Sequence, residues 1–176
     1  MEKPNLILLV LLVSNLILLF CLDLINSTVG SWGFFLYVPA LFFLPATLFL
    51  DRLRALILLF LTGLLYDLSI HSTLGFHGFC LCTAYLIWQE IFKLGRKGLA
   101  HQPVSLQLGI NLLFGVMWAS YAYFFSSFTG VWEWSRMAMD LIFSSLLIIP
   151  IGIWFPRFCT SFTELFQGSP YPKHSK

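Results

Sequence analysis

The chain has 176 residues, of which 59% are hydrophobic and 10% are charged, and its formal net charge is +2. Soluble domains usually carry about 45–50% apolar and about 25% charged residues, so this composition excludes an ordinary soluble domain. High apolar content and low net charge also exclude a disordered protein and a nucleic-acid-binding protein. The class that remains is a polytopic membrane protein.

Long uncharged runs recur along the chain, and a membrane-spanning helix needs about 20 apolar residues. The runs are continuously apolar rather than alternating, which favours helices over strands. We therefore predict an all-α fold, with one domain over 1–156 that contains six transmembrane helices. In chain order these helices are expected at about 5–25, 33–50, 53–70, 74–92, 104–127 and 137–155, followed by a short cytoplasmic tail at 157–176.

Turn residues and prolines mark the boundaries and bends of these helices. Turns are expected after the first helix at 26–30, after the second at 51–54, after the third at 71–73, in the long basic loop 93–103, and at 128–136. Pro39 and Pro45 fall inside the second predicted helix and Pro150 inside the sixth. Since proline removes a backbone hydrogen bond, we expect a kink at each of these positions.

The distribution of Lys and Arg predicts the orientation. Six spans place both termini on one side, and that side would hold nine of the ten Lys and Arg residues, with only Arg136 on the other. Positive residues gather on the cytoplasmic side of membrane proteins. We therefore expect both termini in the cytoplasm.

Asp67 is the most informative polar residue, because it lies near the outer end of the third predicted span. An ionisable group inside a span usually faces other helices or water. One interpretation is structural: the carboxylate satisfies backbone donors at the start of the fourth helix, where Ser72 or Thr73 also caps. The alternatives are contact with a partner protein, or a proton relay, ion site or ligand anchor shared with His71 or His77.

No pattern in the chain indicates catalysis or metal binding. The four cysteines are scattered over apolar segments, and a zinc site needs convergent Cys or His ligands. Zinc-protease, serine-hydrolase and phosphate-binding motifs are absent from the sequence. We predict no catalytic residue, no cofactor and no metal.

The segment 63–86 resembles the MreD family of rod-shape-determining membrane proteins. The family pattern is a glycine, three apolar residues, an aspartate, a short polar turn, Leu-Gly, and an apolar helix that ends near Ala-Tyr-Leu. The matching residues are Gly63, Asp67, Ser72, Thr73, Leu74, Gly75, Ala84, Tyr85 and Leu86. His71 departs from the pattern, because a small residue is common at that position. Most of these residues, together with His77, form a candidate motif with a structural or partner-binding role. The candidate residues are Gly63, Asp67, Ser72, Thr73, Leu74, Gly75, His77 and Tyr85.

The resemblance implies a scaffold rather than an enzyme. MreD-like proteins are multi-pass proteins of the bacterial inner membrane, in the machinery that elongates the cell wall. The implied partners are an MreC-like bitopic protein and, through it, MreB, RodA and a class B penicillin-binding protein, together with membrane lipid. The implied role is support of rod shape and of lateral peptidoglycan synthesis.

Two other classes of function stay open. The first is a small-molecule binding subunit of an energy-coupling-factor type transporter, whose fold MreD-like sequences distantly resemble. In that case Asp67 and His77 are the expected polar contacts to a vitamin-like ligand near the outer face. The second is a membrane enzyme, which needs a further acid or base against Asp67, and only Asp140 or a histidine is available.

Overall fold

The computed structural model describes residues 3–70, 72–93, 103–125 and 131–167. Within these ranges the chain is almost entirely helical and contains no strand, which confirms the predicted all-α class. The helices are α1 (Lys3–Val29), α2 (Phe43–Phe49), α3 (Arg52–Ser69), α4 (Phe76–Lys93), α5 (Pro103–Phe125) and α6 (Val131–Gln167), with short 3-10 helices η1 (Gly30–Trp32) and η2 (Pro39–Phe42). His71, the basic loop 94–102 with Arg96, and the tail 168–176 lie outside the described residues.

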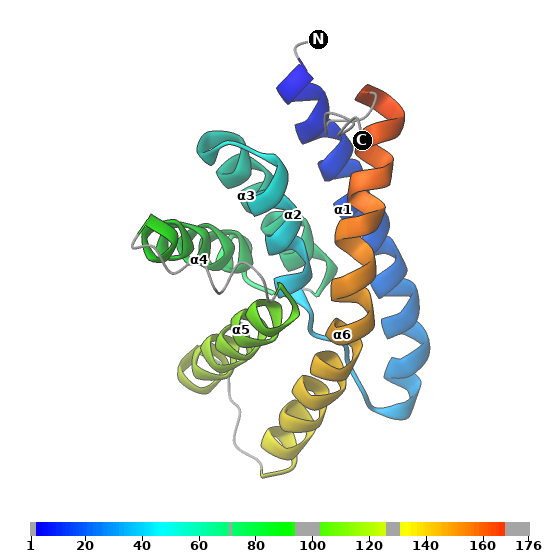
Figure 1. Ribbon diagram of the computed structural model, residues 1–176. Helices are drawn as coiled ribbons and strands as arrows, with labels where there is room; N and C mark the ends of the chain where they lie inside the picture. Colours follow the sequence, from blue (N-terminus) through cyan, green and yellow to red (C-terminus); the bar gives the residue numbers. More distant parts are fainter. Residues whose placement is uncertain (1–2, 71, 94–102, 126–130, 168–176) are drawn as a thin grey trace.

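The helices form one bundle in which α1 and α6 lie side by side and run in opposite directions (Figure 1). The start of α1 and the end of α6 therefore lie at the same end of the molecule. At that end Arg54 Nε donates to Asn5 Oδ1 at 3.0 Å, and Arg54 also pairs with Asp51 at 2.6 Å. This hydrogen-bonded pair holds the pKa of the exposed Asp51 carboxyl below its usual range. At the other end Ser69 Oγ, in the last turn of α3, donates to Asp23 of α1.

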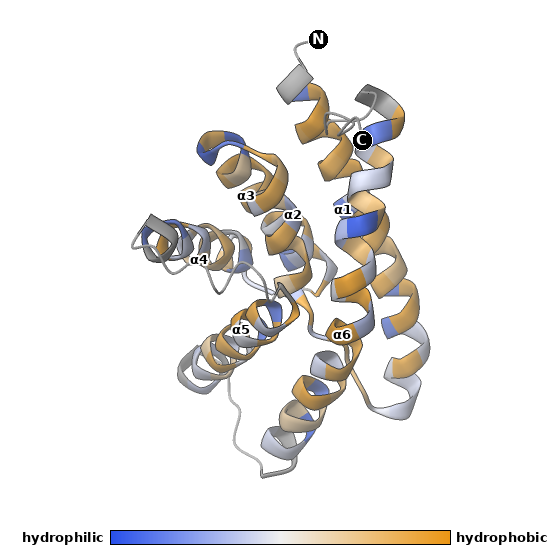
Figure 2. Cartoon of the chain, viewed as in Figure 1, coloured by the Kyte–Doolittle hydropathy of each residue, from blue (hydrophilic) through white to orange (hydrophobic). Residues whose placement is uncertain are grey.

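Three helices are long and apolar enough to cross a membrane. The apolar segments are Asn5–Trp32, which covers most of α1 and all of η1, Val104–Tyr121 within α5 and Trp134–Leu165 within α6, with mean hydropathy of 2.7, 1.3 and 2.0. Apolar residues cover these helices on their outer faces as well as toward the core (Figure 2). Exposed examples are Ile17, Phe20, Leu112, Val116, Ile142 and Leu146. Large apolar side chains on the outside of a bundle are typical of a surface that faces lipid, which supports a membrane protein.

The predicted helix over 33–50 is wrong in its first half. Residues 33–38 are non-helical, Pro39–Phe42 form η2, and only Phe43–Phe49 form the α-helix α2. Gly33 has a φ of 85°, a left-handed conformation that glycine adopts without strain and that turns the chain back into the bundle after α1. Val38 precedes Pro39, and a residue before proline is disfavoured in the helical region. Pro39 therefore starts a helix, and neither it nor Pro45 kinks a longer one.

The non-helical segment 33–38 runs from an exposed Gly33 into the core, where 36–38 are buried, and side chains of four helices form hydrogen bonds with its backbone. Such backbone is tolerated at membrane depth only where protein or a cavity surrounds it. The bonds are Phe35 N to Asp140 Oδ1 at 2.8 Å, Leu36 N to Asn26 Oδ1 at 2.8 Å, Tyr37 N to Ser144 Oγ at 2.7 Å, Val38 N to Tyr66 Oη at 3.3 Å, and Asn111 Nδ2 to Tyr37 O at 3.0 Å. Polar residues inside the apolar helices α1, α3, α5 and α6 thus serve the irregular segment.

Helix α6 extends further than predicted at both ends. The expected helix was 137–155 with a tail from 157, but α6 begins at Val131 and ends at Gln167, with Pro150 and Pro156 inside it. The helix continues past Pro156 because its next turns still pack into the bundle: Cys159 and Thr163 are buried. Tertiary packing therefore outweighs the lost backbone bond and the stop signal that proline usually gives.

The buried side chain of Gln107 in α5 leads to a prediction about the stability of the core. It is fully buried, and neither its side-chain oxygen nor its nitrogen has a hydrogen-bond partner within the described ranges. We expect Gln107→Met, which keeps the length of the side chain, to raise the free energy of unfolding by about 1–3 kcal/mol, because an unpaired buried amide is removed. Thermal unfolding in detergent micelles measures the change. The contrasting variant Asn111→Leu loses a bond to Tyr37 and is expected to destabilise; equal losses in both variants contradict the prediction.

Candidate functional site

The Asp67 carboxylate accepts hydrogen bonds from the turn that joins α3 to α4. Ser72 Oγ donates to Oδ1 at 2.7 Å, and the Gly75 backbone N–H donates to Oδ2 at 2.8 Å. The His77 backbone N–H lies 3.2 and 3.3 Å from the two carboxylate oxygens. Since α4 begins at Phe76, these are donors at a helix N-terminus that no residue within the helix can satisfy. A carboxylate placed there also interacts favourably with the helix dipole.

Gly75 gives the turn its shape. Its φ is 95°, in the left-handed region that residues with a Cβ rarely adopt. The Phe76 N–H donates to Thr73 O at 3.1 Å, and the Thr73 hydroxyl is hydrogen-bonded to that of Tyr121 at the end of α5. Leu74 is 63% exposed at the tip of the turn. The turn therefore joins α3, α4 and α5 at one end of the bundle and presents a single large apolar side chain outward.

His77 extends the Asp67 site into the core. Its Nδ1 lies 2.5 Å from Asp67 Oδ1, and its Nε2 lies 2.8 Å from the Tyr37 hydroxyl. With an ionised Asp67, Nδ1 carries the proton and donates to the carboxylate, so Nε2 accepts from the tyrosine O–H. The imidazole is fully buried and packs edge-on against the Tyr66 ring, with ring centroids 4.9 Å apart. An Asp67–His77–Tyr37 chain thus runs from the turn to the irregular segment 33–38.

A pair of glycines allows α3 and α4 to approach each other. A Cβ on Gly63 would lie 2.3 Å from the Cα and the backbone nitrogen of Gly78. Beside this crossing, Asn15 of α1 donates to the Thr62 hydroxyl at 2.9 Å, and both residues are buried. The α3–α4 hairpin is therefore fixed at its turn by Asp67 and along its length by the backbone contact at Gly63.

The structure brings five of the eight candidate residues together and leaves three apart. Asp67, Ser72, Gly75 and His77 share the hydrogen bonds at the turn, and Thr73 lies in the same turn. Gly63 acts further along the hairpin, and Leu74 points outward. Tyr85 is buried deeper in α4, where its hydroxyl accepts from Gln89 at 3.1 Å and its ring packs edge-on against Phe43.

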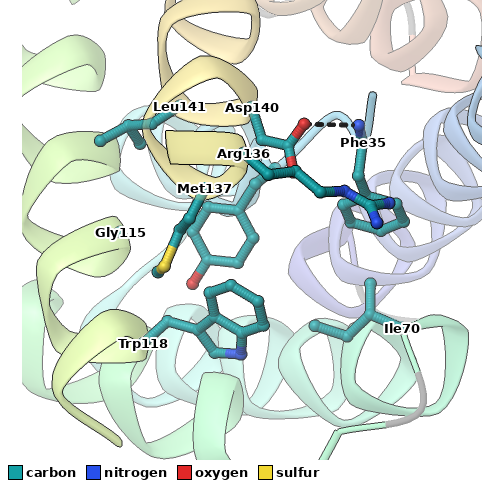
Figure 3. A pocket seen from close by; sticks show the side chains of 9 residues that line it. Phe35, Ile70, Gly115, Trp118, Arg136, Met137, Asp140 and Leu141 are labelled. Carbon is teal, nitrogen blue, oxygen red and sulfur yellow. Dashed lines mark hydrogen bonds between the residues drawn. The ribbon is translucent and has the colours of Figure 1, made fainter. Parts of the chain in front are cut away.

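Sequence reasoning did not find a cavity of about 380 Å³ next to Tyr37. Its lining residues are Phe35, Tyr37, Ile70, Gly115, Trp118, Arg136, Met137, Asp140 and Leu141. In Figure 3 the labelled residues of α6 lie on one side of the space, and Trp118 and Ile70 lie on the opposite side. Asp67 and His77 do not line this cavity; they reach it only through Tyr37, whose ring stacks on Trp118 at 5.6 Å. The feature of the sequence that could have indicated this cavity is Arg136, the one cation expected on the outer side.

Within the described ranges, no group of three or more His, Cys, Asp or Glu side chains is placed to hold a metal ion. The four cysteines are free thiols, of which Cys80 and Cys159 are buried and Cys21 is exposed. The polar side chains of the site form hydrogen bonds with one another and with backbone donors.

Comparison of the chain with protein-family models, curated proteins and solved structures found no match. The resemblance to the MreD family therefore stays a prediction that rests on the residues of the α3–α4 hairpin.

Proposed function

We propose that this chain is a non-catalytic membrane scaffold of the bacterial cell-wall elongation machinery. In this role it lies in the inner membrane with both termini in the cytoplasm and binds an MreC-like bitopic protein. Through that protein it associates with MreB, RodA and a class B penicillin-binding protein, and so supports rod shape and lateral peptidoglycan synthesis.

One observation carries the proposal: the residues of the resemblance act together in the α3–α4 hairpin. Gly63 permits the helix crossing, while Asp67, Ser72 and Gly75 fix the turn. A motif that fixes the geometry of a hairpin suits a protein that presents a surface to other membrane proteins. The exposed apolar faces of α1, α5 and α6 supply surfaces on which the single helix of a bitopic partner can pack within the membrane.

The test is a pull-down of the tagged full chain from its native membrane in mild detergent, followed by mass spectrometry of proteins and small molecules. The proposal expects an MreC-like protein together with cell-wall synthases. A reporter fused after Lys176 that is active only outside the cytoplasm refutes the proposed orientation.

The cavity beside Tyr37 favours a second candidate, the vitamin-binding subunit of an energy-coupling-factor type transporter. Ligand sites are concave, largely apolar spaces with a few polar groups, as this cavity is. The expected polar contacts Asp67 and His77 are not in its wall, so any ligand there meets Arg136 and Asp140 instead. Recovery of transporter ATPase subunits with a stoichiometric vitamin-like molecule selects this candidate over the scaffold.

A further inference from the structure

The cavity beside Tyr37 has walls suited to an apolar or aromatic body. The Tyr37 and Trp118 rings stack with an interplanar angle of 28°, and Phe35, Ile70, Met137 and Leu141 complete the apolar lining. Its volume of about 380 Å³ falls in the range of roughly 300–1,000 Å³ that small-molecule sites occupy. The space is too large to be an ordinary packing defect and is open to a ligand.

Two charged residues of α6, Arg136 and Asp140, line the cavity, and they differ in their hydrogen bonding. The Asp140 carboxylate is half-buried and turned to the Phe35 N–H, from which it accepts at 2.8 Å (Figure 3). Arg136, one turn earlier on α6, is exposed, and its guanidinium makes no hydrogen bond within the part of the chain that the structure describes. Asp140 is thus engaged by the irregular segment, whereas the donors of Arg136 are available to a ligand.

From this arrangement we propose that the cavity binds an anionic amphiphile, with a phosphate or carboxylate on Arg136 and an apolar body between Trp118 and Met137. A guanidinium binds these two anions through paired, charge-assisted hydrogen bonds, which recognise their planar or forked geometry. The acidic neighbour Asp140 interacts electrostatically with Arg136, but its Oδ1 accepts from the Phe35 N–H, so that oxygen is already engaged. The proposal goes beyond the scaffold function and does not depend on it.

The hydrogen-bonded series Asp67–His77–Tyr37 positions one wall of this cavity. His77 fixes the Tyr37 hydroxyl at 2.8 Å, and the Tyr37 ring in turn forms the cavity wall against Trp118. Asp67 and His77 therefore affect the ligand site only indirectly, through the Tyr37 side chain.

Binding of lysophosphatidic acid to the purified full chain in non-ionic detergent tests the proposal, with native mass spectrometry as the readout. We expect stoichiometric binding of lysophosphatidic acid and at least about tenfold weaker binding of lysophosphatidylcholine, in which choline masks the phosphate. Arg136→Gln is expected to weaken lysophosphatidic acid binding about tenfold, as loss of a charge-assisted contact does. The matched control Arg157→Gln, which removes an exposed cation at the other end of α6, is expected to leave it unchanged.

A second pair of variants separates the cavity from the surface of the bundle. Met137→Trp fills the cavity and leaves Arg136 in place, so it is expected to abolish binding, whereas Met139→Trp places the same side chain on the outer face, where Met139 is 44% exposed. Inorganic phosphate that competes in an Arg136-dependent way identifies a free anion as the source of the group; failure of phosphate to compete identifies a lipid headgroup. Equal binding of the two lysolipids, or equal affinity in Arg136→Gln and Arg157→Gln, overturns the proposal.

Discussion

Gly63→Ala is expected to lower the free energy of unfolding by about 3 kcal/mol, the upper part of the range for overpacked cores. The new Cβ would meet backbone atoms of Gly78 at 2.3 Å, and backbone cannot move aside as the end of a side chain can. Alanine has a higher helix propensity than glycine, which favours the variant by about 1 kcal/mol. The clash exceeds that gain, so α3 and α4 must separate.

The matched control for this prediction is Gly109→Ala in α5. Beyond the adjacent residues and the backbone of its own helix, no atom lies within 4 Å of a Cβ built on Gly109, so only the gain in helix propensity acts there, and unchanged or slightly higher stability is expected. Thermal unfolding of both variants in the same detergent gives the comparison. If the two variants unfold at the same temperature, the close crossing at Gly63 does not exist in the membrane protein.

The existence of the helices could be predicted from hydropathy alone, but the path of 33–38 could not. A buried extended segment and a buried helix are both continuous apolar runs, and periodicity does not distinguish them. Local signals were present, because Gly33 and Pro39 bracket an aromatic and β-branched run typical of extended chain. The decisive partners, however, are Asn26, Asp140 and Ser144, and no local pattern pairs them with backbone groups of that segment.

The site was predictable to the extent that it is local in sequence. Asp67 lies eight residues before Gly75 and ten before His77, so a short turn brings all three together. Tyr37 comes from a different part of the chain, and its contact with His77 depends on how the irregular segment folds. The cavity was missed for the same reason, since its wall combines this segment with α5 and α6.

Asp67→Ala is expected to lower the free energy of unfolding by about 3–5 kcal/mol, because each buried donor left without an acceptor costs about 1–3 kcal/mol. The substitution leaves the Ser72 hydroxyl, the Gly75 N–H and the His77 Nδ1–H without their acceptor. Asp67→Asn is expected to lose less but to stay well below the wild type. Its amide retains one oxygen, while donors approach both carboxylate oxygens of Asp67.

Unfolding in detergent, followed by circular dichroism, measures these losses, and Asp23→Ala is the matched control. Asp23 is exposed at the same end of the bundle and accepts from Ser69, so its loss is expected to change stability by no more than about 0.5 kcal/mol. A double-mutant cycle with His77→Phe isolates the contact between the two side chains, for which we expect a coupling of about 1–3 kcal/mol. A coupling near zero would contradict the prediction and would mean that Asp67 stabilises the hairpin only through the Ser72 hydroxyl and the backbone N–H groups of the turn.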